Sequence, residues 1–254
     1  MNYLFPRNKS LRRFLSRLYP PKCAACGRFL PKESTEALCP ECRGKWEKEK
    51  KKTCRKCKAA FALCQCDLKR ETNRANRSVY LTGYDVESPV TMKLLLKQKD
   101  IYRWRTTVFL AREMTEMIRS RLPYADSLLT YCPRSVQNRK RTAFDQSEKL
   151  ARVVSENLAI PFLTLLERTG QGGQQKNLSP KERRSNVFVA YRLAEGAKEQ
   201  IKGKNVILLD DISTTGATLD RCTSLLKRGG AAEVFCAYLA KSNHRSKPYS
   251  EKIG

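Results

Sequence analysis

The sequence predicts an α/β protein in which a mostly parallel β-sheet, flanked by helices, follows a small cysteine-rich module. Eight of the eleven cysteines lie between Cys23 and Cys66. After Arg77, short apolar runs alternate with helical patterns, which is typical of strands and helices that take turns around a sheet. A chain of 254 residues is long enough for one sizeable domain and an appendage.

The N-terminal segment is basic and amphipathic. Leu11, Phe14, Leu15 and Leu18 recur at helical spacing among arginines, so we expect a short helix that docks on the rest of the protein. The opening residues contain no apolar stretch typical of a signal peptide, and no later segment approaches the ~20 apolar residues of a membrane span. We therefore expect a cytoplasmic protein without a transmembrane segment.

The clustered cysteines have the spacing of zinc ligands. Three C-x-x-C pairs and one tighter C-x-C pair supply eight thiolates, enough for two tetrahedral sites of four cysteines each. In a reducing compartment such clusters bind metal more often than they form disulfides. An all-thiolate site leaves no open coordination position, so the zinc is expected to be structural. The expected metal ligands are Cys23, Cys26, Cys39, Cys42, Cys54, Cys57, Cys64 and Cys66.

The number of zinc ions and the pairing of their ligands stay open. Sequential ribbons would join the first four cysteines around one ion and the last four around another. Cross-braced pairing is compatible with the same spacing. Because the Cys64/Cys66 pair is tight, a protein with a single zinc ion is a further alternative.

The elements of the sheet domain follow from apolar runs, which predict strands, and from 3.6-residue patterns, which predict helices. Pro133 ends one of the strands, and Gly229-Gly230 ends the last helix. The polar, glycine-containing stretch 169–186 predicts a surface loop, and long loops in compact domains are usually functional. The expected strands are 78–84, 127–132, 162–168, 206–209 and 232–240, and the expected helices are 89–96, 104–118, 144–158 and 219–226.

The stretch VILLDDISTTGATLDR, residues 206–221, combines an apolar strand, two adjacent carboxylates, several hydroxyls and a glycine. In open α/β sheets ligands bind beyond the carboxyl ends of the strands, where this polar part must lie. A glycine-containing loop that leads into a helix offers unpaired N–H groups to a phosphate. The carboxylates would repel the phosphate, so we expect them to face vicinal ribose hydroxyls and a divalent metal. The stretch therefore predicts a sugar-phosphate site.

This stretch resembles the motif with which type I phosphoribosyltransferases bind phosphoribosyl pyrophosphate (PRPP). Together with the cysteine pairs, NRSVY at 76–80, FDQ at 144–146 and QKNLSPKERRSNV at 175–187, it makes the chain similar to the ComF family of late-competence proteins. The resemblance implies a zinc-ribbon module before a type I phosphoribosyltransferase-like domain. The implied segments are a basic amphipathic segment at 1–22, the zinc-ribbon module at 23–77, the phosphoribosyltransferase-like domain at 78–241 and a polar tail at 242–254.

The resemblance also implies ligands and partners. It implies a role in handling incoming single-stranded DNA during natural transformation, beside a helicase-like competence motor, in the cytoplasm or peripheral to the membrane-bound uptake machinery. By analogy with the superfamily, Mg²⁺ accompanies PRPP, and basic residues of the long loop and of a preceding strand end close over the pyrophosphate. The expected PRPP-binding residues are Asp210, Asp211, Ser213, Thr214, Thr215, Gly216, Ala217, Thr218, Arg134, Lys176 and Arg183.

The sequence leaves the reaction open. The only histidine, His244, lies in the polar tail, which excludes Ser-His and Cys-His nucleophilic arrangements. Phosphoribosyl transfer needs neither, but no acceptor site is visible. Two hypotheses follow. In the first, the protein handles nucleic acid and keeps ribose-phosphate recognition as a binding device. In the second, it is an active phosphoribosyltransferase with an unidentified acceptor and no direct DNA role. We expect the first hypothesis, in which the protein handles nucleic acid.

The net charge of +26 favours a polyanionic partner. Residues 1–78 alone carry +14, from 21 Lys/Arg against 7 Asp/Glu. Basic groups that track a backbone, with Trp46 and Phe61 available for stacking, are the elements of a single-strand site, whereas an acidic protein partner is the alternative. The candidate nucleic-acid residues are Lys50, Lys51, Lys52, Arg55, Lys56, Arg139 and Arg141.

Overall fold

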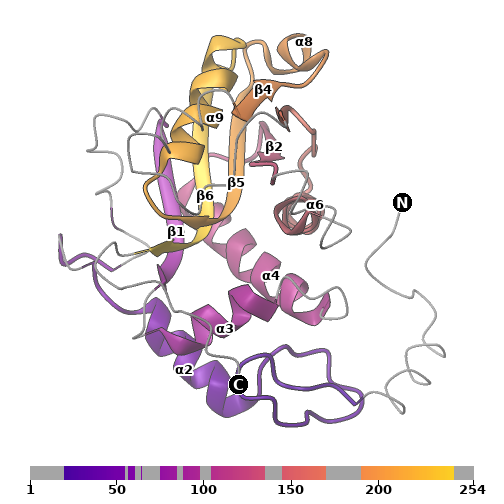
Figure 1. Ribbon diagram of the computed structural model, residues 1–254, viewed down its shortest axis with the longest axis vertical. Helices are drawn as coiled ribbons and strands as arrows, with labels where there is room; N and C mark the ends of the chain where they lie inside the picture. The colour runs from indigo at the N-terminus through magenta and orange to yellow at the C-terminus, as the bar shows by residue number, and fades with distance from the viewer. Residues whose placement is uncertain are drawn as a thin grey trace.

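The computed structural model places the sheet at one end of the molecule and the cysteine-rich module at the other, with α3 (Pro89–Lys97) and α4 (Trp104–Arg121) between them (Figure 1). The structure describes residues 20–54, 57–60, 64, 75–84, 88–97, 104–134, 145–169 and 190–242. The predicted helix around residues 11–18 and almost all of the predicted loop at 169–186 lie outside these residues.

Four parallel strands form the main sheet, in the order β1, β6, β5, β2. Residues in the interior of β5 and β6 are buried on both faces, as the continuous apolar runs predict for a covered parallel sheet. An isolated parallel bridge between Leu129 and Phe162 extends the sheet at the β2 edge. The strands are β1 (Arg77–Tyr84), β2 (Ser127–Tyr131), β5 (Asn205–Ser213) and β6 (Glu233–Ser242).

Helices cover both faces of this sheet. α3, α4 and α6 pack on one face in a core that includes Ile207 and Leu209 of β5, whereas α9 packs on the other face against Val206 and Leu208. Successive strand residues point to opposite faces, which explains this division. Within the described residues, no helix is both long and apolar enough to cross a membrane. The helices are α2 (Pro40–Lys50), α3 (Pro89–Lys97), α4 (Trp104–Arg121), α6 (Gln146–Leu158), α8 (Ala197–Ile201) and α9 (Ala217–Arg228).

The strand predicted at 162–168 forms only in part. The segment first runs beside β2, where the Leu163 N–H donates to the carbonyl of Leu129 (3.0 Å) and the Leu165 N–H donates to the Thr130 hydroxyl (3.3 Å). It then forms β3 (Leu166–Arg168), which pairs antiparallel with β4 (Tyr191–Leu193) in a separate two-stranded ladder. An apolar run predicts a strand but not its partner, and β4 lies more than twenty residues further along the chain.

Helix α2 belongs to the cysteine-rich module and was not predicted, because its sequence is charged on most sides. It begins at Pro40, directly after Cys39, in the position where proline is favoured. Its side chains form ion pairs at helical spacing, such as Lys45 with Glu41 (2.9 Å) and Arg43 with Glu47 (3.2 Å). These exposed pairs support the helix only weakly, so its packing against the sheet domain decides its position.

Two carboxylates join α2 to the sheet domain. Buried Glu49 of α2 accepts hydrogen bonds from the N–H groups of Val90 (3.0 Å) and Thr91 (2.8 Å) and from the Thr91 hydroxyl (2.7 Å). These N–H groups lie in the first turn of α3, where a helix has no internal acceptors for them. Glu49 therefore caps α3 from another element, and its negative charge suits the positive end of the α3 dipole.

The second carboxylate lies on α4 and receives three donors from α2. Glu113 accepts from Arg43 (3.0 Å), from Trp46 Nε1 (3.0 Å) and from Lys50. The Trp46 ring, 1% exposed, packs edge-on against Phe109 of α4 with ring centroids 5.8 Å apart. The apolar residues of the module thus share one core with α3 and α4.

We expect Glu49→Gln to lower the free energy of unfolding by about 1–3 kcal/mol, because the amide replaces one acceptor oxygen by a donor that faces the α3 N–H groups. In a chain of this size, each 1 kcal/mol lowers Tm by about 2–4 °C. The matched control is Glu47→Gln on the exposed side of the same helix, expected to change stability by less than about 0.5 kcal/mol. Thermal unfolding with zinc present measures both, and equal effects in the two variants would contradict the capping role.

Candidate functional site

The predicted ligand loop lies at the carboxyl edge of the sheet, but the strand that carries it is longer than expected. β5 was predicted to end at Leu209 and continues to Ser213. On one side it remains paired with β6, up to Ser213 beside Lys241. On the other side the last residue of β2, Tyr131, pairs with Leu209. The acidic pair therefore has a strand on one side and the chain that follows β2 on the other.

The side chains of Asp210 and Asp211 lie close enough to interact through a hydrogen bond, near the end of β5. The Asp210 side chain lies on the α9 face and is 9% exposed. Burial raises the pKa of Asp210 well above its usual value, and the charge of Asp211 raises it further. Asp211 forms an ion pair with Arg134. The charge of this arginine also opposes the rise in the pKa of Asp210, so one cation acts on both carboxyl groups.

Arg134 is held in place by the start of α6. Its backbone N–H donates to Asp145 Oδ2 (2.7 Å), while Asp145 Oδ1 accepts from the Ser147 N–H (3.0 Å) as the N-cap of α6. Burial raises the pKa of Asp145, although these hydrogen bonds and Arg134 oppose the rise. Asp145 therefore links the end of β2, the start of α6 and the arginine that pairs with Asp211.

The start of α9 is open to an anion. Gly216 precedes the helix with a φ of 80° and provides no side-chain cap, a backbone conformation that favours glycine. Thr214 and Thr215 are exposed beside it, and Thr218 is half-buried in the first turn. The Thr215 hydroxyl accepts a long hydrogen bond (3.4 Å) from the Ala217 N–H. The backbone N–H groups in the first turn of α9 and the positive end of its dipole together favour the binding of a phosphate.

Two buried polar side chains near this edge were missed by the sequence analysis. Gln146 is 1% exposed, and within the described part of the chain neither polar atom of its amide has a hydrogen-bond partner. The Ser147 hydroxyl is likewise buried and has no partner among these residues. Buried polar groups are normally satisfied, so these two are available to a ligand. The FDQ stretch contains the glutamine, but its burial depends on packing that the sequence does not show. Lys176 and Arg183 lie outside the described residues.

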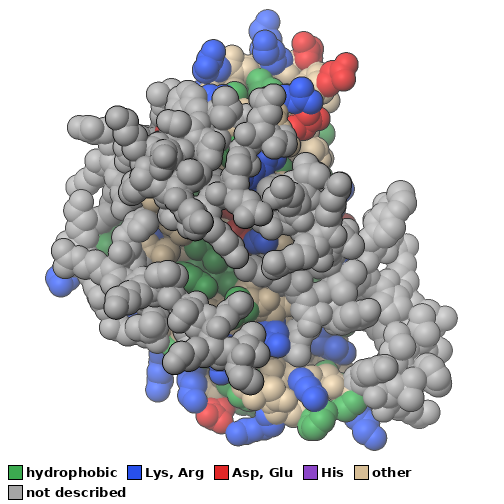
Figure 2. Space-filling model, in the orientation of Figure 1, with side chains coloured by type: hydrophobic (Ala, Val, Ile, Leu, Met, Phe, Trp, Pro, Cys, Tyr) green, Lys and Arg blue, Asp and Glu red, His purple; other side chains and the backbone are tan. Residues whose placement is uncertain are grey.

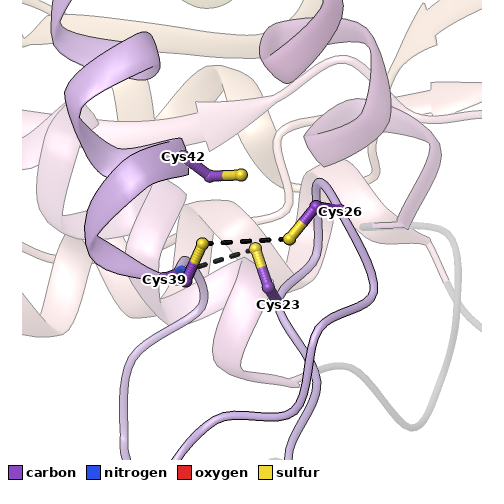
Figure 3. A group of neighbouring side chains, drawn as sticks. All are labelled: Cys23, Cys26, Cys39 and Cys42. Atoms are coloured by element: carbon purple, nitrogen blue, oxygen red, sulfur yellow. Dashed lines mark hydrogen bonds between the residues drawn. The ribbon is translucent and has the colours of Figure 1, made fainter.

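The first four cysteines converge on one point (Figure 3). Cys23, Cys26, Cys39 and Cys42 have their sulfur atoms within 4.8 Å of one another, and the Cys26–Cys39 sulfur distance is 3.8 Å. Zinc–sulfur bonds of about 2.3 Å at tetrahedral angles put neighbouring sulfurs about 3.8 Å apart. The cluster therefore has the size of a zinc site, and its members follow sequential rather than cross-braced pairing.

The electrostatics of this cluster favour a bound cation. Burial works to raise the pKa of Cys23, but backbone N–H groups, among them that of Cys39 (3.4 Å), outweigh it and lower the pKa to about 7. Burial raises the pKa of Cys42, and the three neighbouring thiols raise it further. Four thiolates held this close repel one another, and a divalent cation offsets their repulsion.

A second cluster contains Cys54, Cys57 and Cys64, with 3.6 Å between the sulfurs of Cys57 and Cys64. Cys66, the expected fourth ligand, lies outside the described residues. Three thiols at this spacing fit a zinc ion that takes a fourth ligand from a nearby segment. We propose that the second cluster and Cys66 hold a second structural zinc.

Two family models match the chain. The phosphoribosyl transferase domain matches residues 125–253, just over half of the chain, and the double zinc ribbon domain matches residues 14–70. The chain belongs to the phosphoribosyl transferase domain family. The order of the two domains confirms the predicted fold class and supports structural zinc in the module.

Curated relatives carry names from DNA uptake and use. Competence protein F of Haemophilus influenzae is 34% identical over 103 residues, which are 40% of this chain and 44% of the relative. DNA utilization protein YhgH of Escherichia coli O157:H7 is 34% identical over 95 residues, 37% of this chain and 40% of the relative. These matches confirm the resemblance to the ComF family, and each spans less than half of the relative's length.

Among solved structures, the glutamine PRPP amidotransferase of B. subtilis is similar over 57% of this chain and 30% of its own, with 18% identity and a TM-score of 0.38. The overlap is partial. The assignment to the phosphoribosyl transferase domain family therefore rests on the match to the family model, and the sheet order describes the fold of that domain.

Among the predicted nucleic-acid residues of the module, Lys50 already interacts with other side chains of the protein. Lys50 forms ion pairs with Glu47 (3.0 Å) and Glu113, so its charge already has two partners within the protein. Lys51 is exposed and Lys52 is half-buried. Trp46, expected as a stacking platform, is buried against α4, and that prediction is wrong. Phe61, Arg55, Lys56, Arg139 and Arg141 lie outside the described residues.

We expect two zinc ions per chain in protein purified without chelator, measured by elemental analysis. Replacing Cys39 and Cys42 by serine should leave one zinc and lower Tm, because the module loses the metal that fixes the start of α2. Cys222→Ser, a buried thiol outside both clusters, is the control and should keep two. A single zinc in the wild-type chain would show that the second cluster is not a zinc site.

We expect Asp210→Asn to stabilise the ligand-free protein. Because the pKa of Asp210 is raised in the folded state, the stability that it contributes is fully present below its unfolded pKa and is lost as pH rises toward the folded pKa. The neutral amide avoids this loss, so the gain in Tm should be larger at pH 8 than at pH 5. The control is Asp126→Asn, an exposed residue before β2. A variant that is less stable than wild type at pH 8 would be inconsistent with this account.

Proposed function

We propose that this protein is a competence factor that binds PRPP, or a related ribose phosphate, with Mg²⁺ at the carboxyl edge of its sheet, and that it handles single-stranded DNA. The arrangement at the end of β5 carries the ligand part of the proposal: two carboxylates on a strand, followed a few residues later by the open start of α9. The names Competence protein F and DNA utilization protein YhgH among the relatives support the DNA part.

Each group at the edge matches one part of a ribose phosphate. The N–H groups at the start of α9 and the hydroxyls of Thr214 and Thr215 would donate to the phosphate. The carboxylate of Asp211 would accept from the vicinal hydroxyls of the ribose, in place of its present partner Arg134. Mg²⁺, when bound, would supply positive charge to the pyrophosphate. Arg134 and the unpaired Gln146 amide would then be available to the same anion.

An active phosphoribosyltransferase with no direct DNA role is the second candidate, and the family match itself favours it. Within the described residues, the helices α2 and α3 lie beside the carboxyl half of β1: the Thr82 hydroxyl contacts the carbonyl of Glu49 (3.4 Å). An acceptor of the phosphoribosyl group would have to bind near the same edge. We favour a binding role because the names of the curated relatives refer to competence and DNA utilization.

Calorimetry of the purified protein tests the ligand part. We expect PRPP to bind only with Mg²⁺ and Asp211→Asn to weaken binding by roughly 10- to 100-fold, since a hydrogen bond to a charged group contributes about 1.5–3 kcal/mol. Asp126→Asn, distant from the edge along the chain, should bind as wild type does. Absence of PRPP heat from the wild type, or an unchanged affinity in the Asp210→Asn, Asp211→Asn double variant, would refute the assignment.

A screen of nucleobases and ammonia for release of pyrophosphate from bound PRPP separates the two candidates. Release that depends on one acceptor and is lost in Asp211→Asn identifies a phosphoribosyltransferase. Binding without release for every acceptor supports the binding role. The DNA part is tested independently by fluorescence anisotropy with a labelled single-stranded oligonucleotide, and absence of binding even at low salt would remove it.

A further inference from the structure

A second concave surface lies at the amino ends of β1 and β6, the edge of the sheet opposite Asp210 and Asp211. It is a cleft of about 570 Å³ between the first residues of these two strands and the last turn of α4. Three arginines contribute to it, Arg77 from β1 and Arg119 and Arg121 from α4. The ligand site proposed above uses none of these residues.

Two of the arginines are held by neutral groups. Arg77 Nη1 donates to the carbonyl of Arg121 (2.8 Å), and Arg119 Nη2 donates to the carbonyl of Asn157 (2.6 Å). A carbonyl fixes the orientation of a guanidinium without cancelling its charge, and each guanidinium has further N–H donors. Arg119 also forms an ion pair with Glu116 (3.4 Å), but both side chains are exposed, so this pair contributes little.

The single acidic residue among those that line the cleft is already engaged. The Asn76 side-chain amide donates to Glu233 (3.2 Å), while the Asn76 carbonyl oxygen accepts from the Val234 N–H (3.0 Å). Three arginines against one carboxylate leave the cleft with a formal charge of about +2. The lining therefore presents oriented guanidinium groups with excess positive charge.

This chemistry fits phosphate oxygens, which match the planar fork of arginine. The cleft has no platform for a base, because its aromatic residue, Phe235, is buried in the core of the sheet. A ligand would be held by its phosphates alone and without base readout. On the face shown in Figure 2, Lys and Arg side chains lie at both ends of the molecule, with Asp and Glu side chains beside them.

We propose that this cleft binds the phosphate backbone of single-stranded nucleic acid. The choice of occupant rests on the proposed function, and the open shape and the net charge of +26 support a strand over a small phosphate compound. The ribose-phosphate site and the strand would then occupy opposite edges of one sheet, so that both can be bound at the same time.

The test compares two variants with the same loss of charge. In the first, Arg77, Arg119 and Arg121 are replaced by glutamine. In the second, three exposed arginines outside the cleft, Arg112, Arg192 and Arg228, are replaced by glutamine. Anisotropy with a labelled single-stranded oligonucleotide is measured from 50 to 300 mM salt, where each phosphate contact adds about 0.7 to the log–log slope.

We expect the cleft variant to lose at least 10-fold in affinity near 100 mM salt and to reduce the salt slope by about 2, the sum of three contacts of about 0.7 each. The matched variant should keep the wild-type slope within about 0.5. Calorimetry with PRPP should be unchanged in both. Because Arg119 and Arg121 also lie at the negative end of α4, thermal unfolding shows separately whether the helix has lost stability.

Equal salt slopes in the two triple variants would overturn the cleft as the strand site while leaving the DNA part of the proposed function intact. If the wild type binds no oligonucleotide at any salt, the DNA part of the proposed function fails and this inference fails with it. If inorganic pyrophosphate binds at the cleft and displaces no oligonucleotide, the cleft takes a small phosphate compound, and the proposed occupant is wrong.

Discussion

The site depends on how the chain tolerates two adjacent carboxylates at the end of a buried strand. Asp210 is buried, which raises its pKa, and its neighbour Asp211 forms an ion pair with Arg134. Arg134 in turn is fixed by Asp145, the N-cap of α6. β5 remains paired with β6 as far as Ser213. These contacts keep the two carboxyl groups in one geometry, although their closeness and burial are unfavourable. Such unfavourable placement of ionisable groups is common at ligand-binding sites.

The zinc-ribbon module is coupled to the same domain through helix α2. The cysteine cluster includes Cys39 and Cys42, at the start of this helix, and Glu49 near its end caps α3. Glu113 of α4 holds the middle of α2 through Trp46. A metal bound at one end of the helix would therefore stabilise the hydrogen bonds at the other end. The module also shares one hydrophobic core with the sheet domain.

The sequence predicted the parts of the fold that depend on local pattern. Thiols three positions apart do converge, and the apolar run before Asp210 does form a buried parallel strand. The predictions that failed, and the features that were missed, depend on contacts between segments far apart in the sequence. Trp46 was expected at the surface because its partners, Phe109 and Glu113, lie more than sixty residues away. The burial of Gln146 and the pairing of β3 with β4 depend on tertiary packing in the same way.

Hydrogen–deuterium exchange of the whole protein tests the central claim most directly, because it locates the ligand. With PRPP and Mg²⁺, the account predicts slower exchange in peptides that cover residues 211–220, from the end of β5 into the first turn of α9, and no change there with Mg²⁺ alone. Peptides around Arg77 and Arg121, at the opposite edge, should exchange as in the free protein. Protection confined to that opposite edge, or none anywhere at saturating PRPP, would contradict the account.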